Sequence, residues 1–391
     1  MKQLNADLHL HSRFSIGASP QMDLPRIAAA AHTKGIHIVG TGDCLYQGWL
    51  EELESSLQRH GDRYEFAAIA FILQCEVETT MKGRVHHLIL FPNFSAAAEL
   101  REILLENGYS KLTSGRPQLK ITPERLANLA CTVGALIGPS HAFTPWTSMY
   151  ASYNSIRECY GENAQNVAFV ELGLSADTKM ASKLAELDSY TFVSFSDAHS
   201  PNPNKLGREV TRFCLKDSSF NEVYQALRGI NGRKVVLNIG LDPREGKYYL
   251  TGCRRCKKAY TLEEITVNGG ILKSCPACGG PLKIGVRDRI QLLASMSSEV
   301  SLAQRPPYMH VVPLVEILRA MKRLQPLDIK KTYNELLCKF DNEIDVLVDR
   351  PIRAIRQDYP RLGAILERFR NDEIDFEFVG RGGWYGRIQI Q

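Results

Sequence analysis

Histidines and a carboxylate alternate near the start of this 391-residue chain, in the stretch Asp7-Leu-His9-Leu-His11. Residues two apart in a β-strand point to the same side, so these three polar side chains would share one face. Two imidazoles beside a carboxylate can coordinate one metal ion. The active sites of α/β barrels lie at the carboxyl ends of their strands. A lone histidine would more often be structural, but this pattern predicts a metal site.

Further nitrogen and oxygen ligands occur at the ends of other predicted strands. They are Asp43, Glu76, Glu78, His86, His87, His141, Asp197 and His199. Each is weak on its own, but the ends of barrel strands converge, so the set predicts one cluster. Mixed nitrogen and oxygen donors suit Zn²⁺, Mn²⁺ or iron better than Mg²⁺. Glu171 ends another predicted strand and is either a group that orients a ligand or merely a strand-end carboxylate.

A second kind of metal site is indicated by Cys253-x-x-Cys256 and Cys275-x-x-Cys278, which lie 18 residues apart. This spacing is typical of a structural Zn²⁺ site with four thiolates. Two redox-active cysteine pairs are the alternative, but the βαβ pattern that usually surrounds them is missing. Arg254 and Arg255 in the first pair would either contact a phosphate backbone or only offset the thiolate charge.

The elements that must position these groups alternate between strands and helices in the first 230 residues. Strands are predicted at 4–10, 37–42, 67–75, 85–91, 135–138, 168–172 and 191–195. Helices are predicted at 24–33, after the N-cap Thr122 with Pro123, and after Ser219, where Ser219 and Glu222 form a capping box. This alternation favours an α/β fold with a parallel barrel or a doubly wound sheet.

The remaining chain differs in character. Residues 246–286 are rich in Gly, Cys and Lys, and helices are predicted at 287–295, 312–323, 329–342 and 363–369, before a β-hairpin over 376–390. We therefore expect three domains: 1–235 with the metal cluster, 246–286 as a four-cysteine zinc ribbon, and 287–391 as a mainly helical domain.

Net charge divides unevenly between these parts. The chain carries +5 overall, with −3 in residues 1–232 and +8 in residues 233–391. A basic half favours a polyanionic partner, although a solvated surface would also explain a moderate surplus. The longest apolar run, 66–73, is too short to span a bilayer, and the N-terminal residues do not resemble a signal peptide. We expect a cytoplasmic protein that does not bind membranes.

The motifs DLHLHS (7–12), TGDC (41–44), CEVE (75–78), HHLIL (86–90), PSH (139–141) and SDAHS (196–200) resemble the polymerase-and-histidinol-phosphatase (PHP) superfamily. The resemblance implies a distorted (β/α)₇ barrel that hydrolyses phosphoesters with up to three metals. It implies that Asp197, Glu76 and His199 are catalytic. Its metal ligands would be His9, His11, Glu76 and Asp197 for one ion, with Glu76 bridging to a second ion held by His87 and His141, and Asp43 and His199 for a third.

Two departures affect this ligand set. The superfamily usually has Thr-Asp-His where this chain has Thr41-Gly-Asp43, so a carboxylate would replace an imidazole. His86 and His87 cannot both face the site from a regular strand, and we prefer His87 because it directly precedes the Leu-Ile-Leu run. Zn²⁺ is the expected ion in the four-cysteine site and in the cluster, with Mn²⁺ or Mg²⁺ as alternatives in the cluster.

The order of the three domains resembles the endonuclease Q family over the whole chain. That resemblance implies a DNA repair endonuclease that cuts on the 5′ side of uracil, hypoxanthine, xanthine and abasic sites. Expected DNA contacts are Trp146, Lys205, Arg208, Arg254 and Arg255. Trp146 would stack on an extruded base or pack the barrel rim, and Lys205 and Arg208 would hold the scissile phosphate or be exposed loop charges.

Two other functions compete with this one. A small-molecule phosphatase of the histidinol-phosphatase kind would share the metal cluster but would need neither the zinc ribbon nor the basic half. A non-catalytic DNA-binding module would not need so complete a set of ligands. A sliding clamp is a further partner such an enzyme could have, but we identify no docking motif for it.

Overall fold

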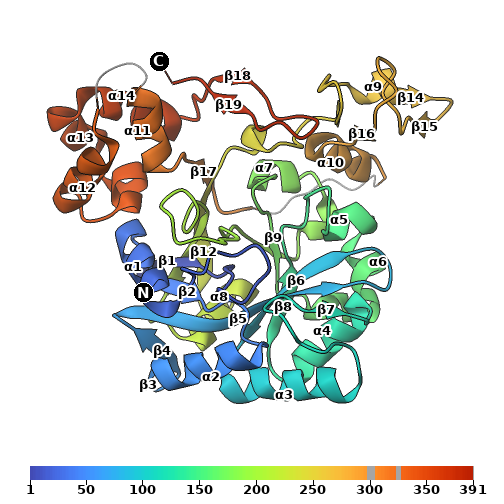
Figure 1. Cartoon of the computed structure of the whole chain (residues 1–391), viewed down its shortest axis with the longest axis vertical. Coiled ribbons are helices and arrows are strands. Elements are labelled where there is room, and N and C mark those ends of the chain that lie inside the picture. The colour runs from blue at the N-terminus through green and yellow to red at the C-terminus, as the bar shows by residue number, and fades with distance from the viewer. Residues whose placement is uncertain (297–303, 323–326, 391) are drawn as a thin grey trace.

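The computed structural model describes residues 1–296, 304–322 and 327–390. Its main sheet has 11 strands, and its longest path runs β17-β12-β11-β1-β2-β5-β4-β3, with β6 and β7 also paired to β5 and β8 paired to β6 (Figure 1). The strands are β1 (Lys2–Asp7), β2 (Ile38–Gly40), β3 (Gln58–His60), β4 (Arg63–Phe66), β5 (Ile69–Thr79), β6 (Val85–Phe91), β7 (Gln118–Leu119), β8 (Leu136–Pro139), β11 (Val210–Leu215), β12 (Lys234–Gly240) and β17 (Tyr308–His310).

The sheet is mixed and curls toward a barrel. Two further strands, β9 (Phe169–Glu171) and β10 (Thr191–Val193), form a parallel pair. Single bridges continue the curl, between Ile137 and Val167 and between Leu10 and Ala198. The distorted α/β architecture is confirmed, but not every strand is parallel: β6 runs antiparallel to both β5 and β8. The turn between β5 and β6 is too short for a crossover, so only antiparallel pairing is open to them.

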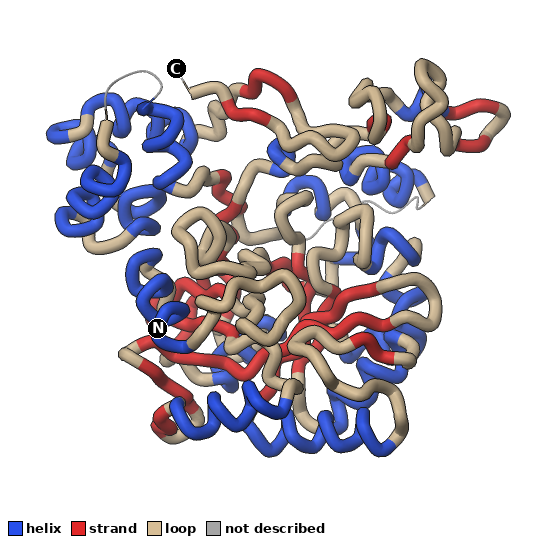
Figure 2. The backbone as a smooth tube through the Cα atoms, viewed as in Figure 1, coloured by secondary structure: helices blue, strands red, loops and turns tan. Residues whose placement is uncertain are grey.

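Helices cover the outside of the sheet, and strands and helices are coloured apart in Figure 2. The helices of this part are α1 (Leu24–Lys34), α2 (Gln47–Ser56), α3 (Phe94–Glu106), α4 (Pro123–Thr132), α5 (Met149–Ser152), α6 (Ile156–Tyr160), α7 (Thr178–Ala181) and α8 (Phe220–Arg228), with 3₁₀ turns η1 (Gly161–Asn166), η2 (Ala185–Leu187) and η3 (Pro243–Glu245). The predicted N-caps Thr122 and Ser219 both accept a backbone N–H. The capping box at Ser219 is only half formed, because Glu222 binds Arg233 and the amide of Lys216 instead.

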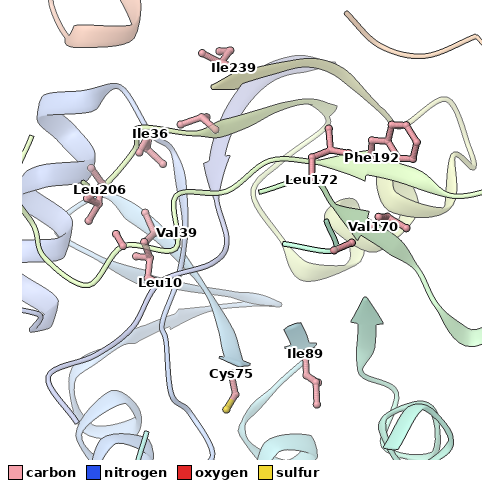
Figure 3. Close-up of a cluster of buried hydrophobic side chains, with 14 of the residues drawn as sticks. Leu10, Ile36, Val39, Cys75, Ile89, Val170, Leu172, Phe192, Leu206 and Ile239 are labelled. Carbon is pink, nitrogen blue, oxygen red and sulfur yellow. The ribbon is translucent and has the colours of Figure 1, made fainter. Parts of the chain in front are cut away.

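Buried side chains alternate between two clusters along β5 and β6. Ile72 and Leu88 belong to a cluster inside the curled sheet, which Val223 of α8 closes at one end. Cys75 and Ile89 belong to the larger cluster between sheet and helices, drawn in Figure 3. Neighbouring residues on these strands therefore point to opposite faces, as strand geometry requires.

The cysteine-rich segment is small and separate from the bundle of C-terminal helices in Figure 1. Its elements are β13 (Gly252–Cys253), α9 (Leu262–Ile265), β14 (Thr266–Val267), β15 (Gly270–Ile271) and β16 (Leu282–Lys283). It is followed by α10 (Val286–Ser295), α11 (Leu314–Lys322), α12 (Ile329–Lys339), the π-helix η4 (Asp345–Asp349), α13 (Ile352–Asp358), α14 (Pro360–Arg370), and the hairpin strands β18 (Phe376–Phe378) and β19 (Arg387–Ile388).

Buried polar contacts fix the C-terminal helices to the sheet. Lys34 of α1 donates to Glu343 at 2.7 Å, with both side chains almost fully buried, and Tyr333 donates to the other oxygen of Glu343. Arg212 of β11 forms a bidentate pair with Asp349 at 2.7 and 2.8 Å. The sheet also continues past residue 235, because β12 pairs with β17, which lies between the predicted helices at 287–295 and 312–323.

The glycine-rich turn of the hairpin packs against the first cysteine pair. The amide of Leu250 donates to the carbonyl of Gly380, and that of Gly383 donates to the carbonyl of Lys247. Gly382 has φ of 54°, and a Cβ there would lie 2.4 Å from the carbonyl oxygen of Cys253. The glycine thus permits a close approach that no larger residue allows. Among the described residues, no helix combines the length and apolar character needed to cross a membrane.

Candidate active site

Seven side chains meet where β5, β6 and β8 and the segments after β1 and β10 come together. Their ligand atoms form three groups, and within each group the atoms lie within 4.8 Å of one another. The groups are His9, His11 and Glu76; His11, Asp197 and His199; and Glu76, His86 and His141. His11 and Glu76 each belong to two groups. The carboxylate of Glu76 lies 2.9 to 3.5 Å from nitrogen atoms of His9, His11, His86 and His141. The sequence-predicted convergence of these ligand types is therefore present.

Several ligand atoms of this histidine–carboxylate cluster have no hydrogen-bond partner among the described residues. Nε2 of His9, Nε2 of His11 and Oδ1 of Asp197 are buried without a hydrogen bond. Burial lowers the pKa of His9, but the charges of Glu171, Asp197 and Glu76 outweigh it and raise this pKa to about 9. Buried imidazoles and carboxylates that face each other in this way are ligands for divalent cations, so the residues fit a metal cluster.

The opposite ring nitrogens are held by carboxylates from behind. Nδ1 of His9 lies 2.9 Å from Glu171, and Nδ1 of His11 lies 3.2 Å from Asp43. Nε2 of His86 lies 3.0 Å from Glu78. A carboxylate behind an imidazole fixes its tautomer and orientation, as in carboxylate–histidine–metal sites. Of the two interpretations of Glu171, this geometry favours the orienting one.

The prediction that His87 points into the cluster is wrong. His87 lies beside Ile89 on the outer face of β6, where its ring nitrogens are 2.8 Å from Tyr160 and 3.0 Å from Thr79. His86 has the same parity as Leu88, which faces the inside of the sheet, and its Nδ1 is 2.9 Å from Glu76. Burial lowers the pKa of His87 to about 3, so this histidine is a neutral structural residue.

Two carboxylates also differ from the expected arrangement. Asp43 is in none of the three ligand groups; it lies behind His11 and accepts hydrogen bonds from the amide and hydroxyl of Ser12. Asp7 does not share a face with His9 and His11, because β1 ends at Asp7. It accepts the amides of Ser196 and Gly207 and so anchors the segment that carries Asp197.

A cavity of about 370 Å³ opens beside the cluster. Its wall includes His86, His141 and Asp197 together with three aromatic side chains, Trp146, Tyr248 and Tyr385. These aromatic residues come from the loop after β8, the segment after η3 and the C-terminal hairpin. The cavity therefore joins metal ligands to flat apolar surfaces.

Trp146 differs from the other aromatic residues of its stretch. Phe143, Tyr150 and Tyr153 are buried and pack the barrel rim, whereas Trp146 is 45% exposed. Nζ of Lys283 lies 3.7 Å from the centre of the Trp146 ring, and the guanidinium carbon of Arg254 lies 5.5 Å from it. These two cations hold the ring by cation–π contacts, while part of its surface stays exposed at the cavity wall.

Lys205 and Arg208 lie on the other side of Asp197. They line a second hollow of about 450 Å³ together with Asp197, His199 and the loop residues Gly17 to Ser19. Arg208 donates from Nε to the carbonyl of Ser196, which fixes its position next to the cluster. Positive charge is thus placed beside Asp197.

The four cysteines of the two Cys-x-x-Cys pairs come together. Sγ of Cys253 lies 3.5 Å from that of Cys278, and Sγ of Cys256 lies 3.7 Å from that of Cys275. Although desolvation raises the pKa of Cys275, the hydroxyl of Tyr260 and nearby amides lower it to about 6. Thiolates gathered in this way fit a tetrahedral metal ion. Arg254 and Arg255 are exposed on this knuckle.

Among the residues of the cavity wall that sequence reasoning missed are Tyr248, Tyr385, Arg84 and Arg116. None of them belongs to a motif, and the tyrosines reach the cavity only because the cysteine-rich segment and the hairpin fold over the barrel. Pairing of β7 with β5 places Arg116, and the end of the β5–β6 turn places Arg84.

Comparisons with known proteins cover the whole chain. The family model described as the MJ0043 C-terminal domain matches residues 313–373. The uncharacterized protein MJ0043 of Methanocaldococcus jannaschii is 36% identical over 64% of this chain. The match spans about a third (32%) of the length of MJ0043. The uncharacterized protein YqxK of Bacillus subtilis is 30% identical over the full length of both chains.

Two solved structures are similar throughout. The lesion-specific endonuclease PfuEndoQ from Pyrococcus furiosus matches with a TM-score of 0.91 and 43% identity, over 100% of this chain and 96% of that one. Endonuclease Q in complex with a 27-mer duplex that has an abasic lesion at the active site matches with a TM-score of 0.90 and 42% identity, over 100% and 97%.

The curled mixed sheet and its histidine–carboxylate cluster, with the whole-chain similarity to these endonucleases, define a metal-dependent hydrolase. The four-cysteine module and the C-terminal helices narrow this class further. The chain belongs to the endonuclease Q family.

Proposed function

We propose that this chain is a metal-dependent DNA repair endonuclease that cuts one strand of duplex DNA on the 5′ side of a damaged nucleotide. The observation that carries the proposal is the cavity in which metal ligands and the rings of Trp146, Tyr248 and Tyr385 share one wall. A small phosphomonoester would need the ligands but not the aromatic surface. An extruded nucleotide needs both, because its sugar-phosphate is cut while its base stacks.

The cluster residues would hold two or three divalent cations. His9, His11, Glu76 and Asp197 would hold one; Glu76, His86 and His141 a second; and His199, beside Asp197, would contribute to a third. Divalent cations there would neutralise phosphodiester charge and activate water for attack. Zn²⁺ is the proposed ion in the four-cysteine site, and Zn²⁺ or Mn²⁺, with Mg²⁺ as the alternative, in the cluster.

The protein's own groups place the DNA. Lys205 and Arg208, which line a hollow together with Asp197, would hold the backbone there. Arg254, Arg255 and the basic surplus of the C-terminal half would bind phosphates farther along the duplex. The aromatic wall would accept deaminated bases such as uracil, hypoxanthine and xanthine, as well as abasic nucleotides, since a damaged nucleotide leaves the stack at the lowest cost.

A nicking assay tests the proposal. Purified protein with Mn²⁺, Mg²⁺ or Zn²⁺ is incubated with otherwise identical duplexes that contain uracil, hypoxanthine, xanthine, an abasic site or no lesion, and with a generic phosphomonoester. We expect one cut 5′ to each lesion by the wild type, and binding without cutting by Asp197→Asn. Phosphate release from the monoester with intact oligonucleotides would instead indicate the small-molecule phosphatase. The proposed location is the cytoplasm.

A further inference from the structure

Two arginines line the cavity next to the cluster, and the proposed function above leaves both unused. Arg84 ends the turn between β5 and β6, and Arg116 lies two residues before the first residue of β7. Strand pairing brings them together, because Glu78 of β5 is opposite His86 of β6 on one side and Gln118 of β7 on the other.

Each guanidinium contacts a carboxylate of the cluster region. Nη1 of Arg116 lies 3.2 Å from Oε2 of Glu76. Nη2 of Arg84 lies 2.7 Å from Oε2 of Glu78, the same oxygen that faces His86. The arginines are therefore fixed relative to the metal ligands by one carboxylate each. Their position in the cavity wall is set by the same strands that set the cluster.

Both guanidinium groups keep hydrogen-bond donors for a ligand. A guanidinium has five N–H donors. Within the described part of the chain, Arg116 uses one of them on Glu76, and its side chain is 29% exposed; that of Arg84 is 60% exposed. The charge of Glu76 is already shared among four imidazoles, so it holds Arg116 only in part. A phosphate accepts two parallel N–H bonds from one guanidinium and is the best-matched ligand.

We propose that Arg84 and Arg116 form a seat for one DNA phosphate, the one on the 3′ side of the damaged nucleotide. This inference rests on the proposed function. The damaged nucleotide would occupy the cavity, and the scissile phosphate would lie at the cluster. Lys205 and Arg208 line the second hollow, which also borders Asp197. The DNA strand would therefore pass the cluster between two pairs of cations, with Arg84 and Arg116 on the side of the damaged nucleotide.

The test measures binding to Asp197→Asn, which we expect not to cut DNA. Its affinity is determined by fluorescence anisotropy, with and without Mn²⁺, for two abasic duplexes. One has normal phosphates, and the other has a single neutral methylphosphonate on the 3′ side of the abasic nucleotide. Arg116→Gln or Arg84→Gln is then introduced into the Asp197→Asn protein, and both affinities are measured again. Lys82→Gln is the matched control, because Lys82 lies on the same turn but pairs with Glu158 outside the cavity.

Removing a charge-assisted phosphate contact should weaken binding of the normal duplex by about 10- to 100-fold. It should also reduce the slope of log affinity against log salt by about one. The methylphosphonate duplex should bind the arginine variants and their parent equally, because the partner of the arginine is already gone. Lys82→Gln should leave both affinities unchanged.

Losses that multiply when the arginine change and the methylphosphonate are combined would refute the seat. A methylphosphonate can instead be placed on the 5′ side of the scissile bond. If that duplex binds the arginine variants and their parent equally, the 3′ assignment is refuted. If Arg116→Gln lowers the melting temperature, the more exposed Arg84→Gln decides. Failure of the proposed function is separate, since it appears as wild-type protein that cuts no lesion duplex at all.

Discussion

Glu171 holds His9 from behind the metal cluster, with its two oxygens 2.9 and 3.0 Å from Nδ1 of the imidazole. The same carboxylate accepts the backbone amide of His141 at 2.9 Å. One buried side chain at the end of β9 therefore orients ligands from two other segments. His141 also has φ of 32°, a left-handed conformation that costs free energy and that this hydrogen bond helps to maintain.

We expect Glu171→Gln to weaken metal binding by about 10- to 100-fold, the usual effect of losing an outer partner of a ligand histidine. An amide can still hydrogen-bond, but it does not fix the imidazole tautomer by charge. Metal content after dialysis against graded chelator concentrations measures the change. Glu162→Gln, an exposed carboxylate on a neighbouring turn, is the control. Unchanged metal retention in Glu171→Gln would show that His9 needs no such orientation.

The neighbours His86 and His87 should respond in opposite ways to substitution. His86→Ala removes a group next to Glu76 and His141, so we expect loss of bound metal and a larger fall in nicking than the ~10- to 100-fold of an outer partner. His87→Gln disrupts the contacts to Tyr160 and Thr79 and should cost about 1–3 kcal/mol of unfolding free energy while metal content is kept.

Metal analysis and denaturant unfolding on both variants make this comparison. Loss of metal in His87→Gln with full retention in His86→Ala would restore the assignment made from sequence.

Sequence rules located most of the cluster for a simple physical reason. The ends of neighbouring strands meet, so polar residues directly after apolar runs, such as His141 and Asp197, can be brought together without knowledge of the packing. The choice between His86 and His87 required the structure. Counting in twos back from the inward-facing Leu88 selects His86. The preference for His87 rests on its place before the Leu-Ile-Leu run, but an unbroken apolar run does not show which of its residues face inward.

The cavity wall could not be predicted in this way. Trp146 follows a ligand in sequence, but Tyr248 and Tyr385 are far from any ligand and reach the cavity through tertiary packing. Their positions depend on the amide of Gly383 bonding Lys247 and on Gly382 fitting against Cys253. The pairing of β12 with β17 is equally non-local. No local propensity or period contains such contacts.

Full affinity for DNA should require zinc in the four-cysteine site. Arg254 and Lys283, which lie over the ring of Trp146, belong to the strands and knuckle that the cysteines hold together. We therefore expect Cys275→Ser to release the zinc and to weaken binding of lesion duplex by about tenfold or more, because structural zinc contributes folding energy directly.

Zinc content and DNA affinity of the purified variant give the measurement. Cys338→Ser, at an exposed cysteine of α12, should change neither. Full affinity in a zinc-free Cys275→Ser protein would show that the knuckle does not shape the cavity wall.

His310 of β17 should make stability depend on pH. Its Nδ1 lies 2.6 Å from Asp372 and its Nε2 lies 3.2 Å from Asp177, with Asp242 nearby. Burial lowers the pKa of His310, but these carboxylates outweigh it and raise the pKa to about 9. A folded-state pKa above the ordinary value stabilises the protein fully below about pH 6.5, and this contribution is lost as the pH rises through about 9.

The wild-type protein should therefore be more stable than His310→Gln by at most about 3 kcal/mol at pH 6, with the difference disappearing near pH 10. Denaturant unfolding of both proteins at a series of pH values measures it. Taking the difference removes the contribution of Glu209, whose pKa is raised to about 8 by burial and which titrates in both proteins. His60→Gln, at an exposed histidine, is the control. A difference that stays constant from pH 6 to pH 10 would mean that His310 is neutral in the folded protein and that Asp177 and Asp372 are held by other contacts.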